Sequence, residues 1–278
     1  MTLGLLDVNL RQGACRAACA LALALAVFVP ARAQPAAPAK KATSAPAAAQ
    51  AAAREVLMRM AGFLGGAEKF SVSLRAGYDA VQKSGQKIEF NENRRITLSR
   101  PDRLRVEAER SDGARTLAVF SGKEITLIDA GSNAYATAPQ PGNIDRSIAY
   151  FVSDLGMRLP LSMLLLARLP AEIEARVKSV DYVEKSTVFG QPAHHIAART
   201  EAVDFQVWIA DGDRPVPLRV VITYKKEAGQ PQYWAQFSDW NLAPAIGNDS
   251  FAAQIPQGAQ KVAFAAQLQR AAAKGAKR

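Results

Sequence analysis

Cysteine is almost absent from this sequence: the only two, Cys15 and Cys19, lie near the N-terminus. The rest of the chain therefore cannot form a disulfide framework, a thiol nucleophile or a thiolate metal site. Neither cysteine stands at the end of an apolar run that is followed directly by a folded domain, which is where a lipidated cysteine is expected. We therefore predict that the protein is not lipidated.

Histidine is equally scarce, and the two histidines, His194 and His195, are adjacent. Adjacent side chains of a strand point to opposite faces, so these two cannot easily share one metal ion or one substrate. The sequence also lacks the nucleophile, zinc-protease, phosphate-loop and dinucleotide motifs of common enzymes. These absences predict that the protein is not an enzyme and has no catalytic residue, no cofactor and no metal site.

The first 33 residues have the pattern of a secretory signal. Arg11 and Arg16 precede an apolar run over residues 17–29, and Ala31-Arg32-Ala33 is a small-x-small cleavage site. The apolar run is short for a membrane span. We expect a signal peptide over residues 1–33, cleavage before Gln34, and a soluble protein that is located in the periplasm or secreted.

The chain is basic, and it remains so without the signal. Its formal net charge of +10 falls to +8 when the three arginines and one aspartate of the signal are removed. Outside the cytoplasm, this charge favours anionic membrane surfaces or acidic envelope proteins as partners, although it also fits a simple role in solubility. No run of lysine and arginine interleaved with aromatic residues is present, so we expect no nucleic-acid partner.

Residues 34–52 consist of alanine, proline, lysine, serine, threonine and glutamine with no large apolar residue, and this composition predicts a disordered linker. A helical pattern follows over residues 51–64 and ends at Gly65-Gly66. The remaining length suits one domain over residues 53–264, with a flexible tail over 265–278. We expect the protein to be a monomer.

From residue 68 onward, apolar residues recur with the period of two that is typical of half-buried strands. Phe70, Val72 and Leu74 alternate with polar neighbours, for example, and short turns with glycine separate successive runs. About eleven strands can be placed in this way, and they do not alternate with helices. The pattern predicts a mainly β fold built on one highly curved antiparallel sheet, a half-barrel.

The most apolar passage, residues 144–169, interrupts the strands and predicts two helices. The first has Ile148, Phe151, Val152 and Leu155 on one stripe and ends at Gly156. The second begins at Pro160 and ends before Pro170. The apolar residues of this second helix are Leu161, Met163, Leu164 and Leu165. These side chains, and Met157 between the two helices, must be covered by the sheet. The helices either fill the sheet or form a lid over a cavity.

Aromatic residues gather in the last long strand, over residues 232–241. On a regular strand, Tyr233 and Phe237 share one face, while Trp234 and Trp240 share the other. They serve either ordinary packing or the wall of an apolar cavity. The residues that we predict to line a hydrophobic cavity and its lid are Ile148, Phe151, Val152, Leu155, Met157, Leu161, Met163, Leu164, Leu165, Trp234 and Phe237.

Four motifs together resemble a known family. They are Pro101-x-Arg103-x-Arg105-x-Glu107, Val207-Trp208-Ile209-x-Asp211, Pro217-Leu218-Arg219 and Asp249-x-Phe251-x-x-x-Ile255-Pro256-x-Gly258. The chain resembles the predicted periplasmic proteins of domain of unknown function 2092 and, more distantly, the lipoprotein carriers and receptors of the LolA/LolB type. The resemblance implies an incomplete antiparallel barrel of about eleven strands, with helices over its concave face.

In those carriers the apolar hollow takes up lipoprotein acyl chains, and an arginine of the barrel holds the lid closed. The resemblance places residues 144–169 as the lid, but it does not map that arginine onto Arg103 or Arg105. It implies a non-enzymatic periplasmic binding or carrier protein for a lipid, a lipoprotein acyl chain or another hydrophobic ligand. The alternative is a protein-interaction or envelope-stress sensing module on the same scaffold.

Overall fold

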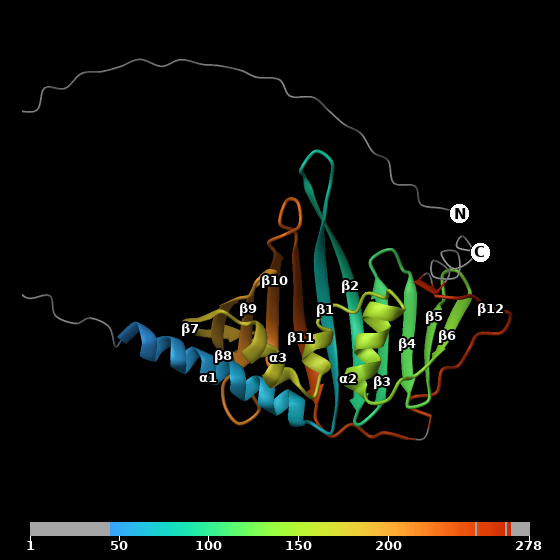
Figure 1. Cartoon of the computed structure of the whole chain (residues 1–278), viewed down its shortest axis with the longest axis horizontal. Helices are drawn as coiled ribbons and strands as arrows, with labels where there is room; N and C mark the ends of the chain where they lie inside the picture. The colour runs from blue at the N-terminus through green and yellow to red at the C-terminus, as the bar shows by residue number, and fades with distance from the viewer. Residues whose placement is uncertain (1–44, 248, 265, 268–278) are drawn as a thin grey trace, which may run out of the picture. The chain divides into compact units, whose positions relative to one another are not determined.

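The computed structural model describes residues 45–247, 249–264 and 266–267. The predicted signal peptide, most of the predicted linker and nearly all of the predicted tail lie outside the described residues. The described part is built on one large sheet with helices against one of its faces (Figure 1).

Twelve strands form this sheet in the order β12-β6-β5-β4-β3-β2-β1-β11-β10-β9-β8-β7, and the sheet does not close into a barrel. Every neighbouring pair is antiparallel except β12 with β6, which is parallel. The strands are β1 (Lys69–Val81), β2 (Lys87–Ser99), β3 (Arg103–Arg110), β4 (Arg115–Ser121), β5 (Glu124–Asp129), β6 (Ala134–Pro139), β7 (Ser179–Val188), β8 (Gln191–Arg199), β9 (Val203–Ala210), β10 (Pro217–Tyr224), β11 (Gln232–Asn241) and β12 (Gln260–Lys261).

The predicted mainly β fold with an open, curved antiparallel sheet is confirmed, with twelve strands rather than about eleven. The additional strand, β12, has only two residues and is paired to the edge of β6, where the Gln260 amide donates to the Asn133 carbonyl. Two residues are too few to show a period of two, which is why the sequence did not predict this strand.

Alternation along the strands separates two faces of the sheet. In β1, Phe70, Val72 and Leu74 are buried in the core, whereas Arg75 is exposed. We call the face that carries Phe70 and Leu74 the inner face, because the helices cover it, and the opposite face the outer face.

Helix α1 (Ala45–Gly66) lies across the end of the sheet that holds β7, with Leu57, Met60 and Leu64 buried beneath it. The helix begins at Ala45, within the stretch for which the sequence predicted a disordered linker. Alanine has the highest helix propensity of all residues, so the alanine-rich stretch before residue 52 continues the helix in the N-terminal direction.

The central apolar passage begins with α2 (Ile144–Ala149), whose first turn is capped by the Asn143 side chain. The predicted first helix is present, but its second half is a π-helical turn, η1 (Tyr150–Asp154), in which the Leu155 amide donates to the Tyr150 carbonyl. Gly156 follows in the left-handed conformation, at φ +71°, which ends the helix as predicted.

The predicted second helix, from Pro160 to Pro170, is wrong. Only a short 3-10 helix, η2 (Ser162–Leu165), forms there, and α3 (Leu169–Arg176) begins where a helix was predicted to stop. Pro170 lies in the first turn of α3. A proline has no amide hydrogen to donate, and the first turn is the part of a helix where none is needed, so the same residue fits a start as well as a stop.

The predicted position of Trp240 is also wrong, because β11 contains a bulge. The register against β1 shifts between Ser71 and Ser73, and Asp239 adopts φ 55°. The extra residue returns Trp240 to the inner face, where its ring centroid lies 5.9 Å from that of Phe237 and 5.4 Å from that of Phe70.

Candidate functional site

An apolar cavity of about 200 Å³ lies between the inner face of the sheet and the helices. Its sheet wall consists of Val203, Phe205 and Val207 from β9 and of Val220 and Ile222 from β10. The opposite wall comes from three helical elements, as Leu57 and Met60 of α1, Leu161, Met163 and Leu164 around η2, and Leu169, Ile173 and Val177 of α3 and its end.

Most residues that line the cavity are apolar. The polar ones are Ser162, Glu172, Arg176 and Thr200. Pockets for small molecules usually have about 300–1,000 Å³. The cavity is therefore suited to one slender apolar chain in this conformation, and a larger ligand would require the helices to move.

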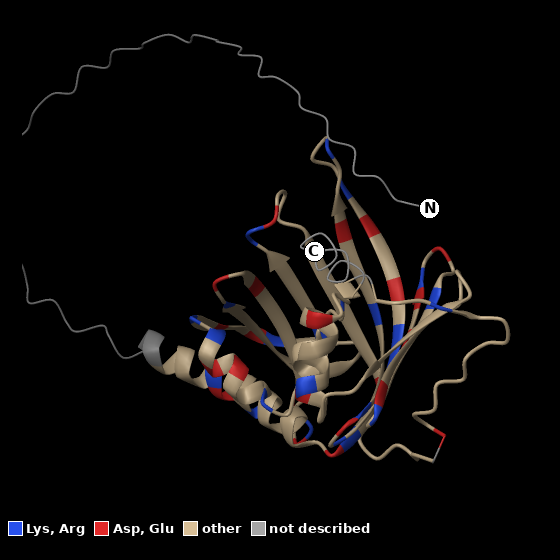
Figure 2. Cartoon of the chain, turned by 45° about the vertical axis from the view of Figure 1, so that its right-hand side comes forward, with Lys and Arg blue, Asp and Glu red and all other residues tan. Residues whose placement is uncertain are grey.

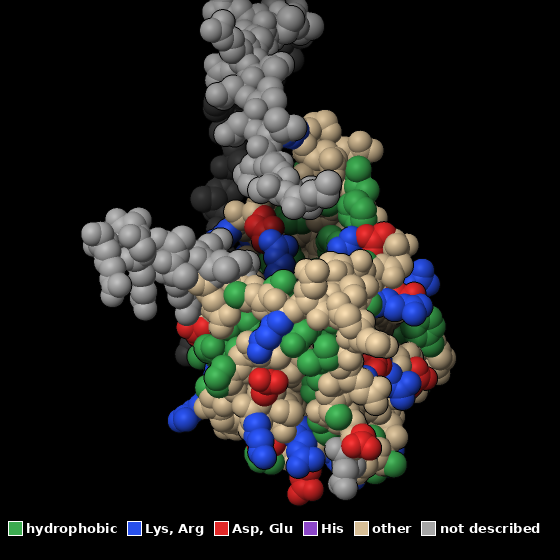
Figure 3. All heavy atoms as spheres, turned by 90° about the vertical axis from the view of Figure 1, so that its right-hand side faces the viewer, with side chains coloured by type: hydrophobic (Ala, Val, Ile, Leu, Met, Phe, Trp, Pro, Cys, Tyr) green, Lys and Arg blue, Asp and Glu red, His purple; other side chains and the backbone are tan. Residues whose placement is uncertain are grey.

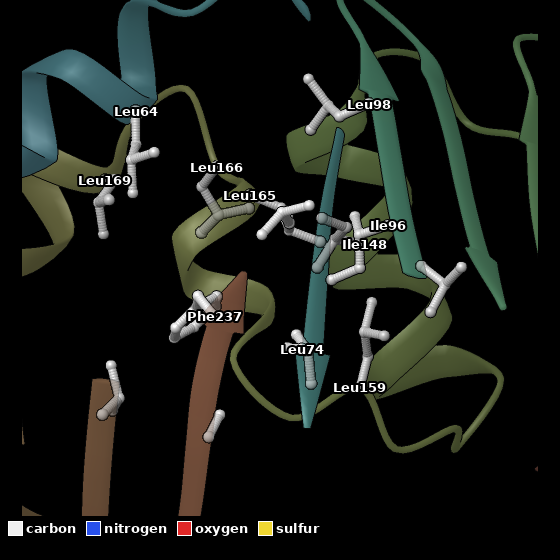
Figure 4. Packing of buried hydrophobic residues seen from close by; sticks show 14 of the residues in the cluster. Leu64, Leu74, Ile96, Leu98, Ile148, Leu159, Leu165, Leu166, Leu169 and Phe237 are labelled. Carbon is white, nitrogen blue, oxygen red and sulfur yellow. The ribbon is translucent and has the colours of Figure 1, made fainter. Parts of the chain in front are cut away.

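Residues 156–168, which we call the lid loop, cover this cavity between η1 and α3. Leu161, Met163 and Leu164 line the cavity, although Met163 is also 39% exposed. Leu165 is buried, and it lines a much smaller void together with Phe237 of β11. Figure 4 shows Leu165 and Leu166 among residues of the sheet such as Leu74, Ile96 and Phe237.

The other predicted lining residues of the helical passage do not line the cavity. Ile148, Phe151 and Leu155 are buried under α2 and η1, where the Phe151 ring lies 5.4 Å from the Phe120 ring of β4. Met157 is partly buried against the same core, and Val152 is 39% exposed. The buried residues Ile148, Phe151 and Leu155 hold the start of the lid loop on the sheet.

Trp234 lies on the outer face, away from the cavity. Its indole Nε1 donates a hydrogen bond of 3.0 Å to Glu89 Oε2, and its ring is so close to Gly77 that a Cβ on Gly77 would lie 2.6 Å from Nε1. The Arg219 guanidinium lies 5.6 Å from the ring centroids of both Trp234 and Trp208. Trp234 is therefore part of a cation–π stack.

The main wall of the cavity, in β9 and β10, was not among the residues predicted from the sequence. The alternation of Val203, Phe205 and Val207 placed these side chains on one face, but many strands of the chain show such alternation. What distinguishes β9 and β10 is that α1 and α3 leave a gap above them, and this depends on contacts between distant elements.

Arg100 connects the lid loop to α1 and to the end of β2. Its guanidinium donates to the carbonyls of Leu64 and Ala67 at the end of α1 and to the Leu165 carbonyl, at 3.3, 3.0 and 3.1 Å. Burial lowers the pKa of Arg100, and the nearby Asp145 carboxylate acts in the opposite direction.

Asp145 also holds the C-terminal end of the lid loop. It lies in α2 and is only 8% exposed, and its two carboxylate oxygens accept from the amides of Ala167 and Arg168 at 2.9 and 3.1 Å. By contrast, Arg103 and Arg105 lie on the outer face, where the cross-strand partners are Ser99 and Ser121 for Arg103 and Thr97 and Val119 for Arg105, so neither is positioned to hold a lid.

A polar cluster interrupts the inner face next to the lid loop. Arg94 forms an ion pair of 2.6 Å with Glu92, both side chains are 9% exposed, and Arg94 Nη1 donates to the Pro160 carbonyl at 3.4 Å. The buried Tyr233 lies nearby. The sequence itself indicates this polar cluster, because Glu92 and Arg94 interrupt the row of inner-face residues between Phe90 and Ile96.

Within the described ranges, no group of three or more histidine, cysteine, aspartate or glutamate side chains could hold a metal ion. No helix in the described part of the chain is both long and apolar enough to span a membrane.

Charge of both signs is spread over the molecule. Figure 2 shows acidic and basic residues along the long strands and the helices. On the face seen in Figure 3, basic and acidic side chains are interspersed with apolar ones. The net positive charge is therefore not gathered into one patch on that face.

Several solved structures are similar to this chain at low identity. The lipoprotein LppX of Mycobacterium tuberculosis shares 13% identity over 73% of this chain and 100% of its own, with a TM-score of 0.45. MucB from the MucA/MucB complex of Pseudomonas aeruginosa shares 19% over 73% and 61%, with a TM-score of 0.40. A LolA superfamily protein of Nitrosomonas europaea shares 10% over 72% and 97%, with a TM-score of 0.34.

No curated protein matches this sequence. One family model does, and it covers residues 53–265, well over half of the chain, which agrees with the resemblance carried by the four motifs. The chain therefore belongs to the family described as predicted periplasmic protein, DUF2092.

Proposed function

We propose that this protein is a non-enzymatic periplasmic binding or carrier protein, which holds a lipid, a lipoprotein acyl chain or another apolar ligand beneath the lid loop. The observation that carries the proposal is the apolar cavity of about 200 Å³ between β9, β10 and three helical elements. Protein interiors are normally close-packed, so an apolar cavity of this size is a suitable place for a ligand. One of its walls is a loop, which the side chains of Arg100 and Asp145 hold in place.

The physical chemistry of the lining favours an acyl chain. Each methylene that moves from water into such a cavity gains roughly 0.8 kcal/mol, without any specific polar contact. Met60 and Met163 on the helical side are unbranched and flexible, so they can adapt to ligands of different shape.

Filling the cavity with protein side chain tests the proposal. Phe205 lines the cavity, whereas Phe189 is 75% exposed in the turn between β7 and β8. The Phe205→Trp variant should take up less of a fluorescent acyl probe, and its matched control, Phe189→Trp, should bind the probe as the unchanged protein does. Native mass spectrometry of the exported protein should show bound acyl compounds. Equal uptake by all three proteins, together with an empty spectrum, would contradict the proposal.

A second candidate function, binding of an envelope protein, is favoured by the edge strand β7. β7 is ten residues long, has β8 as its single strand neighbour among the described residues, and exposes Tyr182 and Val183. An exposed edge can take an additional strand from another polypeptide. A photo-crosslinker at residue 183 should then capture a defined envelope protein in intact cells, and a crosslinker at the exposed residue 255 should not. The same products from both positions would argue against strand addition at β7.

A further inference from the structure

The polar cluster beside the cavity contains two hydrogen-bonding atoms without a partner. Glu92, Arg94 and Tyr233 are on the inner face, and Tyr233 as a whole is only 3% exposed. By distance and angle, neither Arg94 Nε nor the Tyr233 hydroxyl completes a hydrogen bond among the described residues, although the Glu92 carboxylate lies close enough to the hydroxyl to act on it, and both atoms are buried. Buried polar atoms are nearly always paired, so two unpaired atoms in one cluster indicate a place for a polar group of a ligand.

This cluster lies at the edge of the apolar cavity. The Pro160 carbonyl accepts from Arg94, and the next residue, Leu161, lines the cavity. On the sheet side, Ile222 lines the cavity and is the cross-strand partner of Tyr233. Cross-strand partners on one face bring their Cβ atoms to about 5 Å, so an apolar chain in the cavity would bring its polar end to the cluster.

The charge of the cluster limits the kind of polar end. Arg94 and Glu92 neutralise each other over 2.6 Å. A carboxylate placed against them would add an uncompensated negative charge in a buried place, which is unfavourable. A neutral oxygen that accepts hydrogen bonds carries no such penalty.

The two unpaired atoms also define the direction of the hydrogen bonds. Arg94 Nε can only donate, because arginine has no acceptor. Burial raises the pKa of Tyr233 well above its usual value of 10, with Arg94 acting against the rise and Glu92 adding to it. The hydroxyl therefore stays protonated and able to donate.

We propose that Arg94 Nε and the Tyr233 hydroxyl bind the carbonyl oxygen of an acyl ester or acyl amide whose hydrocarbon chain occupies the cavity. This inference rests on the proposed function and narrows its ligand class. Acyl chains with a neutral carbonyl head are preferred over free fatty acids and over plain hydrocarbons.

Competition against a fluorescent acyl probe tests this preference with three ligands of one chain length: methyl decanoate, decanoate at pH 8, and decane. Methyl decanoate should bind about tenfold more tightly than decane, which is the effect of one hydrogen bond to a charged donor. Decanoate should bind more weakly than the ester. Equal binding of ester and decane, or tighter binding of decanoate, would overturn the inference while leaving the cavity as a ligand site. Failure of all three ligands to bind would contradict the proposed function itself.

Two variants assign the effect to the cluster. Tyr233→Phe removes the hydroxyl and Arg94→Lys keeps the charge beside Glu92 but removes Nε, so each should reduce ester binding toward that of decane and leave decane binding unchanged. The matched control, Tyr135→Phe, lies in β6, far along the sheet order from β11. Because the Tyr233 hydroxyl makes no hydrogen bond of ordinary geometry, Tyr233→Phe should fold with a thermal stability close to that of the unchanged protein. Unchanged ester binding in the folded Tyr233→Phe and Arg94→Lys variants would overturn the assignment.

Discussion

The Arg100 guanidinium donates a hydrogen bond of 3.1 Å to the Leu165 carbonyl and so joins the end of β2 to the lid loop. The same side chain donates to two carbonyls at the end of α1. One cation therefore holds together two of the elements that cover the cavity. The position of the lid loop depends on polar contacts as well as on the burial of its leucines.

Replacing Arg100 by methionine should lower the free energy of unfolding by about 2–4 kcal/mol, because three partly buried carbonyls lose a charged donor. Urea denaturation measures this change. The control is Arg103→Met, because Arg103 is exposed on the outer face, and it should cost less than about 0.5 kcal/mol. Similar losses in the two variants would show that Arg100 has no special role.

A charge in the lid loop should abolish ligand uptake. Leu164 lines the cavity, so the Leu164→Asp variant would place an unpaired carboxylate against the apolar ligand. Probe uptake should fall at least tenfold. The comparison is Val152→Asp, at a position that is 39% exposed just before the lid loop. Undiminished uptake by a folded Leu164→Asp protein would mean that the lid loop does not contact the ligand.

Acid should weaken the start of α3. Burial raises the pKa of Glu172, but hydrogen bonds from Arg176 and Arg168 outweigh it and bring the pKa below its ordinary value of 4.5. A carboxylate with a lowered pKa stabilises the fold fully above pH 4.5, and this contribution is lost as the pH falls through the lowered pKa. Both arginines are about half exposed or more, so the contribution should be under about 1 kcal/mol.

The matching measurement is urea denaturation of the unchanged protein and of Glu172→Gln at pH 7 and pH 3. The difference between the two proteins should be present at pH 7 and shrink at pH 3. Glu174→Gln, at an exposed position of the same helix, should show no such dependence. A difference that stays constant with pH would rule out the carboxylate as its cause.

Substitution by alanine should have opposite effects at two glycines, because Gly77 lies against Trp234 whereas Gly62 has open space around it. Alanine at position 77 would force its Cβ into the indole ring, so Gly77→Ala should destabilise the protein by about 1–3 kcal/mol. Gly62 is exposed in α1 and has open space around its missing Cβ, so Gly62→Ala should stabilise by about 0.5–1 kcal/mol. Thermal unfolding of both variants checks these signs, and a stable Gly77→Ala protein would show that the ring can move away.

The sequence predicted those parts of the fold that depend on local periodicity. Phe70, Val72 and Leu74 show which face of β1 is buried, and similar alternation identified most strands of the sheet. Prediction from local patterns failed where one pattern is compatible with two structures. Pro170 is compatible with the end of one helix and with the first turn of the next, and only the contacts of α3 with α1 and η2 decide between them.

The candidate site could be predicted only in part for the same reason. Leu161, Met163 and Leu164 were expected to face a cavity, and they line one. The face of Trp240 depends on a bulge at Asp239 that the composition of β11 does not reveal. The position of the cavity over β9 and β10 depends on the gap between separate helices, which no single stretch of sequence encodes.

The central claim is that an acyl chain lies between the sheet and the lid loop, and intermolecular nuclear Overhauser effects test it most directly. The protein, with isotope-labelled valine and leucine methyl groups, is mixed with methyl decanoate. Our account predicts contacts from the ligand methylenes to the methyl groups of Val207, Val220 and Leu164, which line the cavity. Contacts only to exposed residues such as Val183 or Val262 would contradict the account.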